Sequence, residues 1–304
     1  MILHKRYLPF SEDQLRSHFA HVKKNGRCIG TADKHIKHYK RSIENYNEYT
    51  ERTPNRNKKP ISELKKPFQI EKDEKFWTAS CLMTVFHGKK RVEQFVALFK
   101  KAYGPLPPIP GIESWEECFE GDLHLFFETN LPSPASYKNW LRRNLKDRQF
   151  IPYIVESDNG RKNLEGPTNV DALLINASNG FAVLIEAKIL SDISYQITYD
   201  VMRNQIARNV DVMLEANPNL CPPLDDRDPE KSLFLLLTPR LFKDNPSSRL
   251  YGYKFNEYKS VPASLGKDLS HRTDKNLEII SKRLGWLTWE DFHGANKNCC
   301  KWLK

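Results

Sequence analysis

The sequence of 304 residues predicts an α/β fold, with a mixed central β-sheet flanked by helices and a basic helical region at the N-terminus. Three observations predict this fold. Two apolar runs, Val170 to Ile175 and Phe181 to Ile185, flank a Ser-Asn-Gly turn signal, as in a β-hairpin. A third apolar run, Ser232 to Thr238, is typical of a strand buried on both faces. Segments with helical spacing of apolar residues lie before and after these strands.

The composition favours a soluble protein in the cytoplasm. With 39% hydrophobic residues, a chain of this length can bury a sizeable core. The sequence contains no apolar run near the ~20 residues of a membrane span, and its first residues lack the apolar stretch of a signal peptide. The six cysteines are dispersed, without zinc-ligand or disulfide-framework spacing, so we expect them to be reduced.

The net charge of +10 lies almost wholly in the first fifth of the chain. Residues 1–66 hold sixteen Lys and Arg against seven Asp and Glu. A basic region of this kind indicates a polyanionic partner, although a solvated, soluble flank is the plainer alternative. We therefore predict two parts, a basic accessory region with its linker at 1–67 and a main domain at 68–304.

The accessory region is predicted to be a helical hairpin. Ser11 and Gln14 match a capping box that starts one helix, with Gly26 as its stop. A second helix is predicted from Thr31. Its outward side carries basic residues that we expect to contact nucleic acid: Lys34, Lys37, Lys40 and Arg41.

The remaining elements follow from apolar spacing and from proline and glycine signals. We predict a linker at 50–67, a strand at 150–156, and helices at 72–87, 89–103, 113–130 with a break near Gly121, 136–145 and 275–284. A helix of about twenty residues is expected after Lys188, ending before Pro218. It has apolar residues on two sides, which indicates that it is covered on two sides. Gln205 and Arg208 on this helix are therefore expected to face the hairpin.

The register of the central hairpin brings two acids together. A four-residue loop at 177–180 pairs Ile175 with Ala182, and the same register puts Asp171 opposite Glu186. Lys188 shares the face of Glu186 because side chains alternate along a strand. Opposed like charges destabilise a sheet by up to ~1 kcal/mol unless a cation lies between them. Carboxylate oxygens are the ligands that Mg²⁺ and Mn²⁺ prefer, so the pair indicates a divalent metal site.

Asp171 and, fifteen residues later, Glu186-Ala187-Lys188 resemble the motif of the PD-(D/E)XK nuclease superfamily. Gln205 and Arg208 look like the glutamine and basic residue that several branches of the family carry on the next helix. The sequence departs from the family pattern at Val170, where the family name implies proline. The resemblance covers about residues 112 to 292 and implies a restriction-endonuclease-like fold.

The resemblance also implies roles for these residues. Asp171, Glu186 and the Ala187 carbonyl would hold Mg²⁺, for which Mn²⁺ can substitute. Lys188 would orient or help to deprotonate the attacking water and offset charge on the phosphate. Gln205 and Arg208 would position Lys188, the water or the phosphate. The family usually adds an acid from an earlier helix, for which either Glu128 or Glu116 is a candidate.

The function that follows is a Mg²⁺-dependent endonuclease of the restriction or defence type, acting on double-stranded DNA. Cleavage of both strands takes two such centres, which favours a homodimer. Two alternatives stay open: a catalytically inactive nucleic-acid-binding protein on the same fold, and a nuclease that cleaves RNA. A third, purely structural interpretation treats Asp171, Glu186 and Lys188 as a cross-strand cluster of ion pairs.

Overall fold

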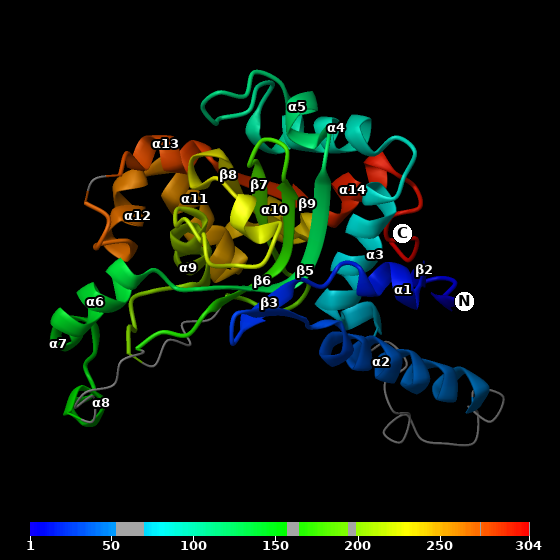
Figure 1. Cartoon of the computed structure of the whole chain (residues 1–304), viewed down its shortest axis with the longest axis horizontal. Coiled ribbons are helices and arrows are strands. Elements are labelled where there is room, and N and C mark those ends of the chain that lie inside the picture. The colour runs from blue at the N-terminus through cyan, green and yellow to red at the C-terminus, as the bar shows by residue number, and fades with distance from the viewer. Residues whose placement is uncertain (53–69, 157–163, 194–198, 274, 304) are drawn as a thin grey trace.

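The computed structural model describes residues 1–52, 70–156, 164–193, 199–273 and 275–303. Its centre is a five-stranded mixed sheet with helices on both faces (Figure 1). In spatial order the strands are β5 (Leu123–Leu131), β6 (Thr168–Asn176), β7 (Ala182–Ala187), β8 (Ser232–Thr238) and β9 (Leu284–Thr288). Strands β5, β6 and β7 are antiparallel neighbours, while β7, β8 and β9 run parallel. The predicted α/β class and mixed sheet are confirmed.

The central hairpin forms in the predicted register. Ile175 pairs with Ala182, and the pairing continues to Ala172 opposite Ile185. The loop closes where the Gly180 amide donates to the Asn176 carbonyl at 2.9 Å. Gly180 has φ of 78°, a left-handed conformation that glycine adopts without steric cost. The predicted strand at Ser232–Thr238 is also confirmed, and all seven of its residues are buried.

Helices fill the chain between and around these strands. They are α1 (Glu12–Arg16), α2 (Ala32–Arg52), α3 (Glu74–Phe86), α4 (Arg91–Tyr103), α5 (Trp115–Phe119), α6 (Ala135–Arg143), α7 (Leu145–Arg148), α8 (Pro152–Glu156), α9 (Gln205–Met213), α10 (Arg240–Asp244), α11 (Leu250–Ser260), α12 (Pro262–Asp268), α13 (Leu277–Lys282) and α14 (Trp289–Ala295). Short 3₁₀ turns lie at Ile70–Lys72, Leu224–Asp226, Pro229–Lys231 and Pro246–Ser248.

The two faces of the sheet are buried by different helices. On one face Leu174 and Val183 lie in a core cluster with side chains of α3, α4 and α14. On the other face Leu173 and Leu184 cluster with α9 and α11. Alternate residues of one strand thus enter opposite cores, which explains why β6, β7 and β8 are apolar on both faces.

The N-terminal region differs from the predicted helical hairpin. The capping box at Ser11 and Gln14 is present, but the helix that it starts ends at Arg16. The chain then forms the antiparallel strands β3 (His21–Lys24) and β4 (Arg27–Gly30). The turn between them is Asn25-Gly26, both with positive φ, a combination typical of two-residue hairpin loops. This local turn signal outweighs the helical spacing of the apolar residues around it.

Other N-terminal elements pack against the main core. Strands β1 (Ile2–His4) and β2 (Leu8–Ser11) pair with each other. The predicted second helix is confirmed as α2, and its Ile36 and Tyr39 belong to the same buried cluster as Phe76 of α3. Most of the predicted linker at 50–67, and with it the predicted domain boundary, lies outside the described residues.

Three other predictions of local structure are wrong. The helix expected over 113–130 ends at Phe119, because Gly121 at φ 84° breaks it and the following residues form β5. The strand expected at 150–156 is the short helix α8, with Pro152 at its first position. The long helix expected after Lys188 is only α9, which begins at Gln205 behind the N-cap Asn204. Part of the interval before it, 194–198, lies outside the described residues.

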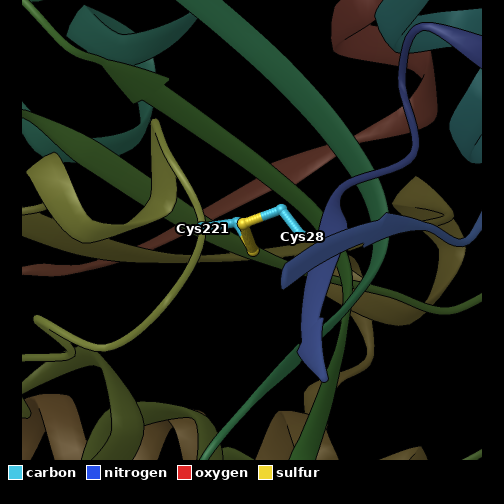
Figure 2. The surroundings of a disulfide bond; sticks show 2 residues. All are labelled: Cys28 and Cys221. Atoms are coloured by element: carbon cyan, nitrogen blue, oxygen red, sulfur yellow. A yellow bond between two sulfur atoms is a disulfide. The ribbon is translucent and has the colours of Figure 1, made fainter. Parts of the chain in front are cut away.

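A disulfide joins Cys28 of β4 to Cys221, with their Cα atoms 5.9 Å apart (Figure 2). The expectation that every cysteine is reduced is wrong for this pair. Because 193 residues separate the two cysteines, no local spacing in the sequence signals their pairing. The other four cysteines are free and buried. None of the helices in the described parts of the chain has the length and hydrophobicity to cross a membrane.

Candidate active site

The carboxyl end of β7 brings the predicted motif residues together. Glu186 and Ala187 end the strand, and Lys188 follows, with its backbone amide bound to the Leu237 carbonyl. The Asp171 carboxylate reaches across from β6 and accepts a hydrogen bond from the Ala187 amide at 2.8 Å. The Lys188 ammonium lies 2.5 Å from the Glu186 carboxylate. Two acids and one ammonium group therefore meet at the sheet edge where α/β proteins usually bind ligands.

Glu74, the first residue of α3, adds a third acid that the sequence analysis missed. Its carboxylate lies 3.8 Å from the Lys188 ammonium and accepts a hydrogen bond from the Ser191 hydroxyl. Asp73 caps the helix by accepting from the Lys75 amide at 3.0 Å, which fixes the position of this first turn. We call Glu74, Asp171, Glu186 and Lys188 the site cluster. The signal in the sequence was the pair Asp73-Glu74 at a helix start, where acids are favourable.

Of the two acids named from the sequence, Glu128 borders the site cluster and Glu116 lies elsewhere. Glu128 is in strand β5, where its carboxylate pairs with Lys75 at 2.6 Å. Glu116 lies on α5 and pairs with Lys100 on α4 at 3.5 Å. Glu128 does share a cavity with the site cluster. This cavity of about 330 Å³ is lined by Lys72, Asp73, Glu74, Lys75, Thr78, Glu128 and Asp171. Glu128 also has a positive φ of 51°, a strained conformation of the kind found beside functional sites.

The site cluster has more negative than positive charge. Burial, followed by the charge of Glu186, raises the pKa of the Asp171 carboxyl well above its usual value. Burial also raises the pKa of Glu74. Burial alone would lower the pKa of Lys188, but Glu186, Asp171 and Glu74 together raise it above its usual value. One ammonium group thus serves three carboxylates, and a further cation would relieve their repulsion.

Asn209 is a second residue that the sequence analysis missed. From α9 its side-chain amide donates to the Glu186 carboxylate at 2.9 Å, and the residue is fully buried. Its amide oxygen has no hydrogen-bond partner among the described residues. Asn209 follows Gln205 by four residues, so the helical spacing placed both on one face. This contact holds one oxygen of Glu186 while Lys188 holds the other.

Of the helix residues named from the sequence, Gln205 contacts Asn209 of the site, and Arg208 meets Glu165. Gln205 begins α9, and its backbone carbonyl accepts from the Asn209 side chain at 3.1 Å. The Arg208 guanidinium lies 3.7 Å from the Glu165 carboxylate and donates to the Pro167 carbonyl at 3.5 Å. Arg208 therefore faces the segment that enters β6, and no contact with Lys188 is found among the described residues.

The four basic residues predicted to bind nucleic acid lie on α2, and all four are exposed. Lys40 pairs with Glu12 of α1 at 2.7 Å, which offsets part of its charge. Within the parts of the chain that the structure describes, Lys34, Lys37 and Arg41 make no ion pair. Their binding role stays a prediction.

No protein-family model, no curated protein and no solved structure matches this chain. The PD-(D/E)XK resemblance thus stays a hypothesis, and the support for it is the geometry of the site cluster.

The donor types of the site cluster fit a hard divalent cation. Asp171, Glu186 and Glu74 offer carboxylate oxygens, and the Ala187 carbonyl lies between the two motif residues. Within the described residues, no group of three or more acidic, histidine or cysteine side chains is already arranged around a common point. The Lys188 ammonium lies within 4 Å of both Glu186 and Glu74.

Proposed function

We propose that this chain is a metal-dependent endonuclease of the PD-(D/E)XK type, which hydrolyses phosphodiester bonds of double-stranded DNA in restriction or defence. One observation carries the proposal: Asp171, Glu186 and Lys188 converge at the carboxyl end of β7 beside Glu74. A surplus of buried and half-buried carboxylates beside one ammonium group suits a site that receives a divalent cation and a phosphate. A restriction-endonuclease-like fold, a cytoplasmic location and a homodimer belong to the same proposal.

Phosphodiester hydrolysis needs charge neutralisation at the phosphate, an activated water and stabilisation of the leaving oxygen. Mg²⁺ held by Asp171, Glu186 and Glu74 would supply Lewis acidity and lower the pKa of bound water. Without metal, the neighbouring acids raise the pKa of Lys188 above its usual value. Lys188 would donate hydrogen bonds to the phosphate or to the attacking water. Asn209 keeps Glu186 in place through its amide.

The test is cleavage by purified protein of duplex DNA, single-stranded DNA and RNA, with Mg²⁺ or with EDTA. We expect Mg²⁺-dependent cleavage of the duplex, and a loss of about 10²–10⁴-fold in Lys188→Ala and Asp171→Asn. Lys282→Ala removes an exposed lysine from α13 and serves as the matched control, with activity unchanged. Circular dichroism and urea unfolding would verify that each variant is folded.

Each alternative predicts a different outcome. Duplex binding without cleavage under any metal condition would favour the catalytically inactive binding protein. Cleavage confined to RNA would favour the ribonuclease. The close pair of Lys188 and Glu186 is the observation that favours the structural ion-pair interpretation. Under that interpretation the unaltered chain cleaves no nucleic acid, and Lys188→Ala lowers only its stability.

A further inference from the structure

The hairpin of β3 and β4 follows a segment that is bonded to β5 beside Glu128, a residue of the candidate site's cavity. The segment that leads into it is fixed to β5, since the Phe127 amide donates to the His18 carbonyl at 2.8 Å. Phe127 precedes Glu128, which lines the cavity of the site. The segment that leaves the hairpin is fixed as well, because the Thr31 hydroxyl donates to the Ala20 carbonyl. All ten residues from 21 to 30 are nevertheless exposed.

The hairpin carries three basic side chains, Lys23, Lys24 and Arg27, beside its Asn25-Gly26 tip. None of the three makes an ion pair with an acid in the described parts of the chain, so their charge faces solvent. Opposite pairing puts Lys24 and Arg27 on the same face of the ribbon. A paired ribbon with unpaired positive charge is complementary to a phosphate backbone.

The same face also presents Val22 opposite Ile29, which are 40% and 46% exposed. These two side chains form a small apolar patch beside Lys24 and Arg27. Lys23 and Cys28 face the other way, and there the disulfide to Cys221 anchors the ribbon to the loop beyond α9 (Figure 2). One face of the ribbon is thus tied to the protein, and the other is presented outward.

We propose that β3 and β4 form a DNA-gripping arm, whose outward face lies against the duplex bound at the candidate active site. The proposal rests on the proposed nuclease function and names the part of the chain that holds the substrate. With a rise of ~3.3 Å per residue, four-residue strands reach roughly 13 Å, the length of about four base pairs. A two-stranded ribbon also fits the major groove of B-form DNA, where apolar side chains contact thymine methyl groups.

The arm is tested by the triple variant Lys23→Ala, Lys24→Ala and Arg27→Ala in the full chain. Fluorescence anisotropy would measure its affinity for a 20-base-pair duplex in Ca²⁺ without Mg²⁺, over a series of salt concentrations. We expect a loss of about 10- to 100-fold in affinity near 0.1 M salt. The slope of log K against log salt should fall in magnitude by about 2, since Lys24 and Arg27 lie on the outward face and each phosphate contact contributes ~0.9.

A matched control removes three exposed lysines far from Glu74, which begins α3. Lys89→Ala and Lys90→Ala lie just after the end of α3, and Lys297→Ala lies near the C-terminus. The two triple variants lose the same net charge, so a difference between them measures position and not charge alone. Lys297 is close to α4, because its neighbour Asn296 donates to Gln94 at 3.3 Å. We expect affinity within about threefold of the unaltered chain.

The outcomes separate the arm from the nuclease proposal. Equal losses in the two triple variants, or an unchanged salt slope in the arm variant, would overturn the arm while leaving the nuclease proposal intact. A loss of affinity in the arm variant for an RNA duplex but not for a DNA duplex would also overturn it. If the unaltered chain neither binds nor cleaves DNA or RNA, both proposals are wrong.

The disulfide gives a second, independent test. Cys28→Ser and Cys221→Ser together release the arm while keeping its three charges. Pre-organisation lowers the entropic cost of binding, so we expect a threefold to tenfold loss in affinity with an unchanged salt slope. Unchanged affinity in this double variant would overturn the anchoring part of the proposal.

Discussion

Two buried groups of charged residues differ in how completely their charges are paired. The site cluster has three acids around the single ammonium of Lys188. The second group, which includes Asp211 of α9, has two acids matched by two arginines, with a histidine beside them. We call it the structural cluster, and it consists of Glu165, Arg203, Asp211, His271 and Arg272.

Asp211 is the centre of the structural cluster. It contacts Arg203 at 2.7 Å, Arg272 at 2.5 Å and His271 at 2.9 Å. Burial alone would raise the pKa of Asp211, but the His271 hydrogen bond and the two arginines hold it well below its usual value. Arg203 also lies over the Tyr137 ring, 3.5 Å from its centroid.

The comparison shows how buried charge can be interpreted. Where every charge has a partner, removing one leaves the others uncompensated, and the group acts in stability. Where charges of one sign are in excess, their repulsion lowers the stability of the fold, and a bound cation would relieve that repulsion. Charge balance therefore favours assigning function to the site cluster and a structural role to the other.

The largest expected effect is on the structural cluster. Asp211→Ala leaves two buried guanidinium groups without their shared acid, so we expect the free energy of unfolding to fall by about 3–5 kcal/mol. Urea denaturation followed by circular dichroism would measure it. The exposed Asp244→Ala on α10 is the control, with a change within about 0.5 kcal/mol. A small effect for Asp211→Ala would remove the contrast between the two clusters.

The next effect concerns the third acid. If Glu74 helps to hold the metal, Glu74→Gln lowers cleavage of duplex DNA by about 10- to 100-fold. Glu128→Gln, which alters an acid on the same cavity that pairs with Lys75, is expected to lower it by less than about fivefold. Initial rates over a range of Mg²⁺ concentrations would compare them, since lost affinity shifts the Mg²⁺ midpoint. The reverse order of effects would assign the role to Glu128.

The sequence predicted the motif but not the residues around it, for a physical reason. Asp171 and Glu186 lie on neighbouring strands joined by a short loop, so local pairing rules fix their register. Glu74 and Asn209 reach the site only because α3 and α9 pack on opposite faces of the sheet. Long-range packing of that kind has no local signal.

The same limit explains the errors elsewhere. Arg208 was expected to face the hairpin acids because its helix is apolar on two sides. Periodicity gives the faces of a helix but not its neighbours, and Glu165 is the acid that Arg208 meets. In the N-terminal region the Asn-Gly turn was a stronger local signal than the apolar spacing, and it produced a hairpin.

Mg²⁺ should stabilise the folded chain through the site cluster and not through the structural cluster. At a Mg²⁺ concentration ten times the dissociation constant, mass action adds about 1.4 kcal/mol to the stability of the folded state. We expect this gain in the unaltered chain and its loss in Asp171→Asn, measured by urea unfolding with Mg²⁺ against EDTA. Glu165→Gln, in the structural cluster, should keep the gain although its baseline stability is lower. Equal stabilisation of all three would indicate non-specific binding of Mg²⁺.

The smallest effect is a difference in pH dependence at Asp171, measured without metal. Because folding raises the pKa of Asp171, the folded chain binds more protons than the unfolded chain between the two pKa values. The free energy of unfolding therefore falls as pH rises from about 4, the pKa of Asp171 in the unfolded chain, through its higher pKa in the folded chain.

Asp171→Asn keeps the acceptor for the Ala187 amide but cannot ionise. We expect it to match the unaltered chain near pH 4 and to exceed it by about 1 kcal/mol at pH 7.5, by urea unfolding in EDTA. Asp211→Asn should show the opposite pH dependence, because folding lowers the pKa of Asp211. This variant should be less stable than the unaltered chain above about pH 4, and the difference should disappear well below pH 4. If Asp171→Asn is instead less stable at pH 7.5, attraction to Lys188 outweighs repulsion from Glu186, and the site cluster is as balanced as the structural one.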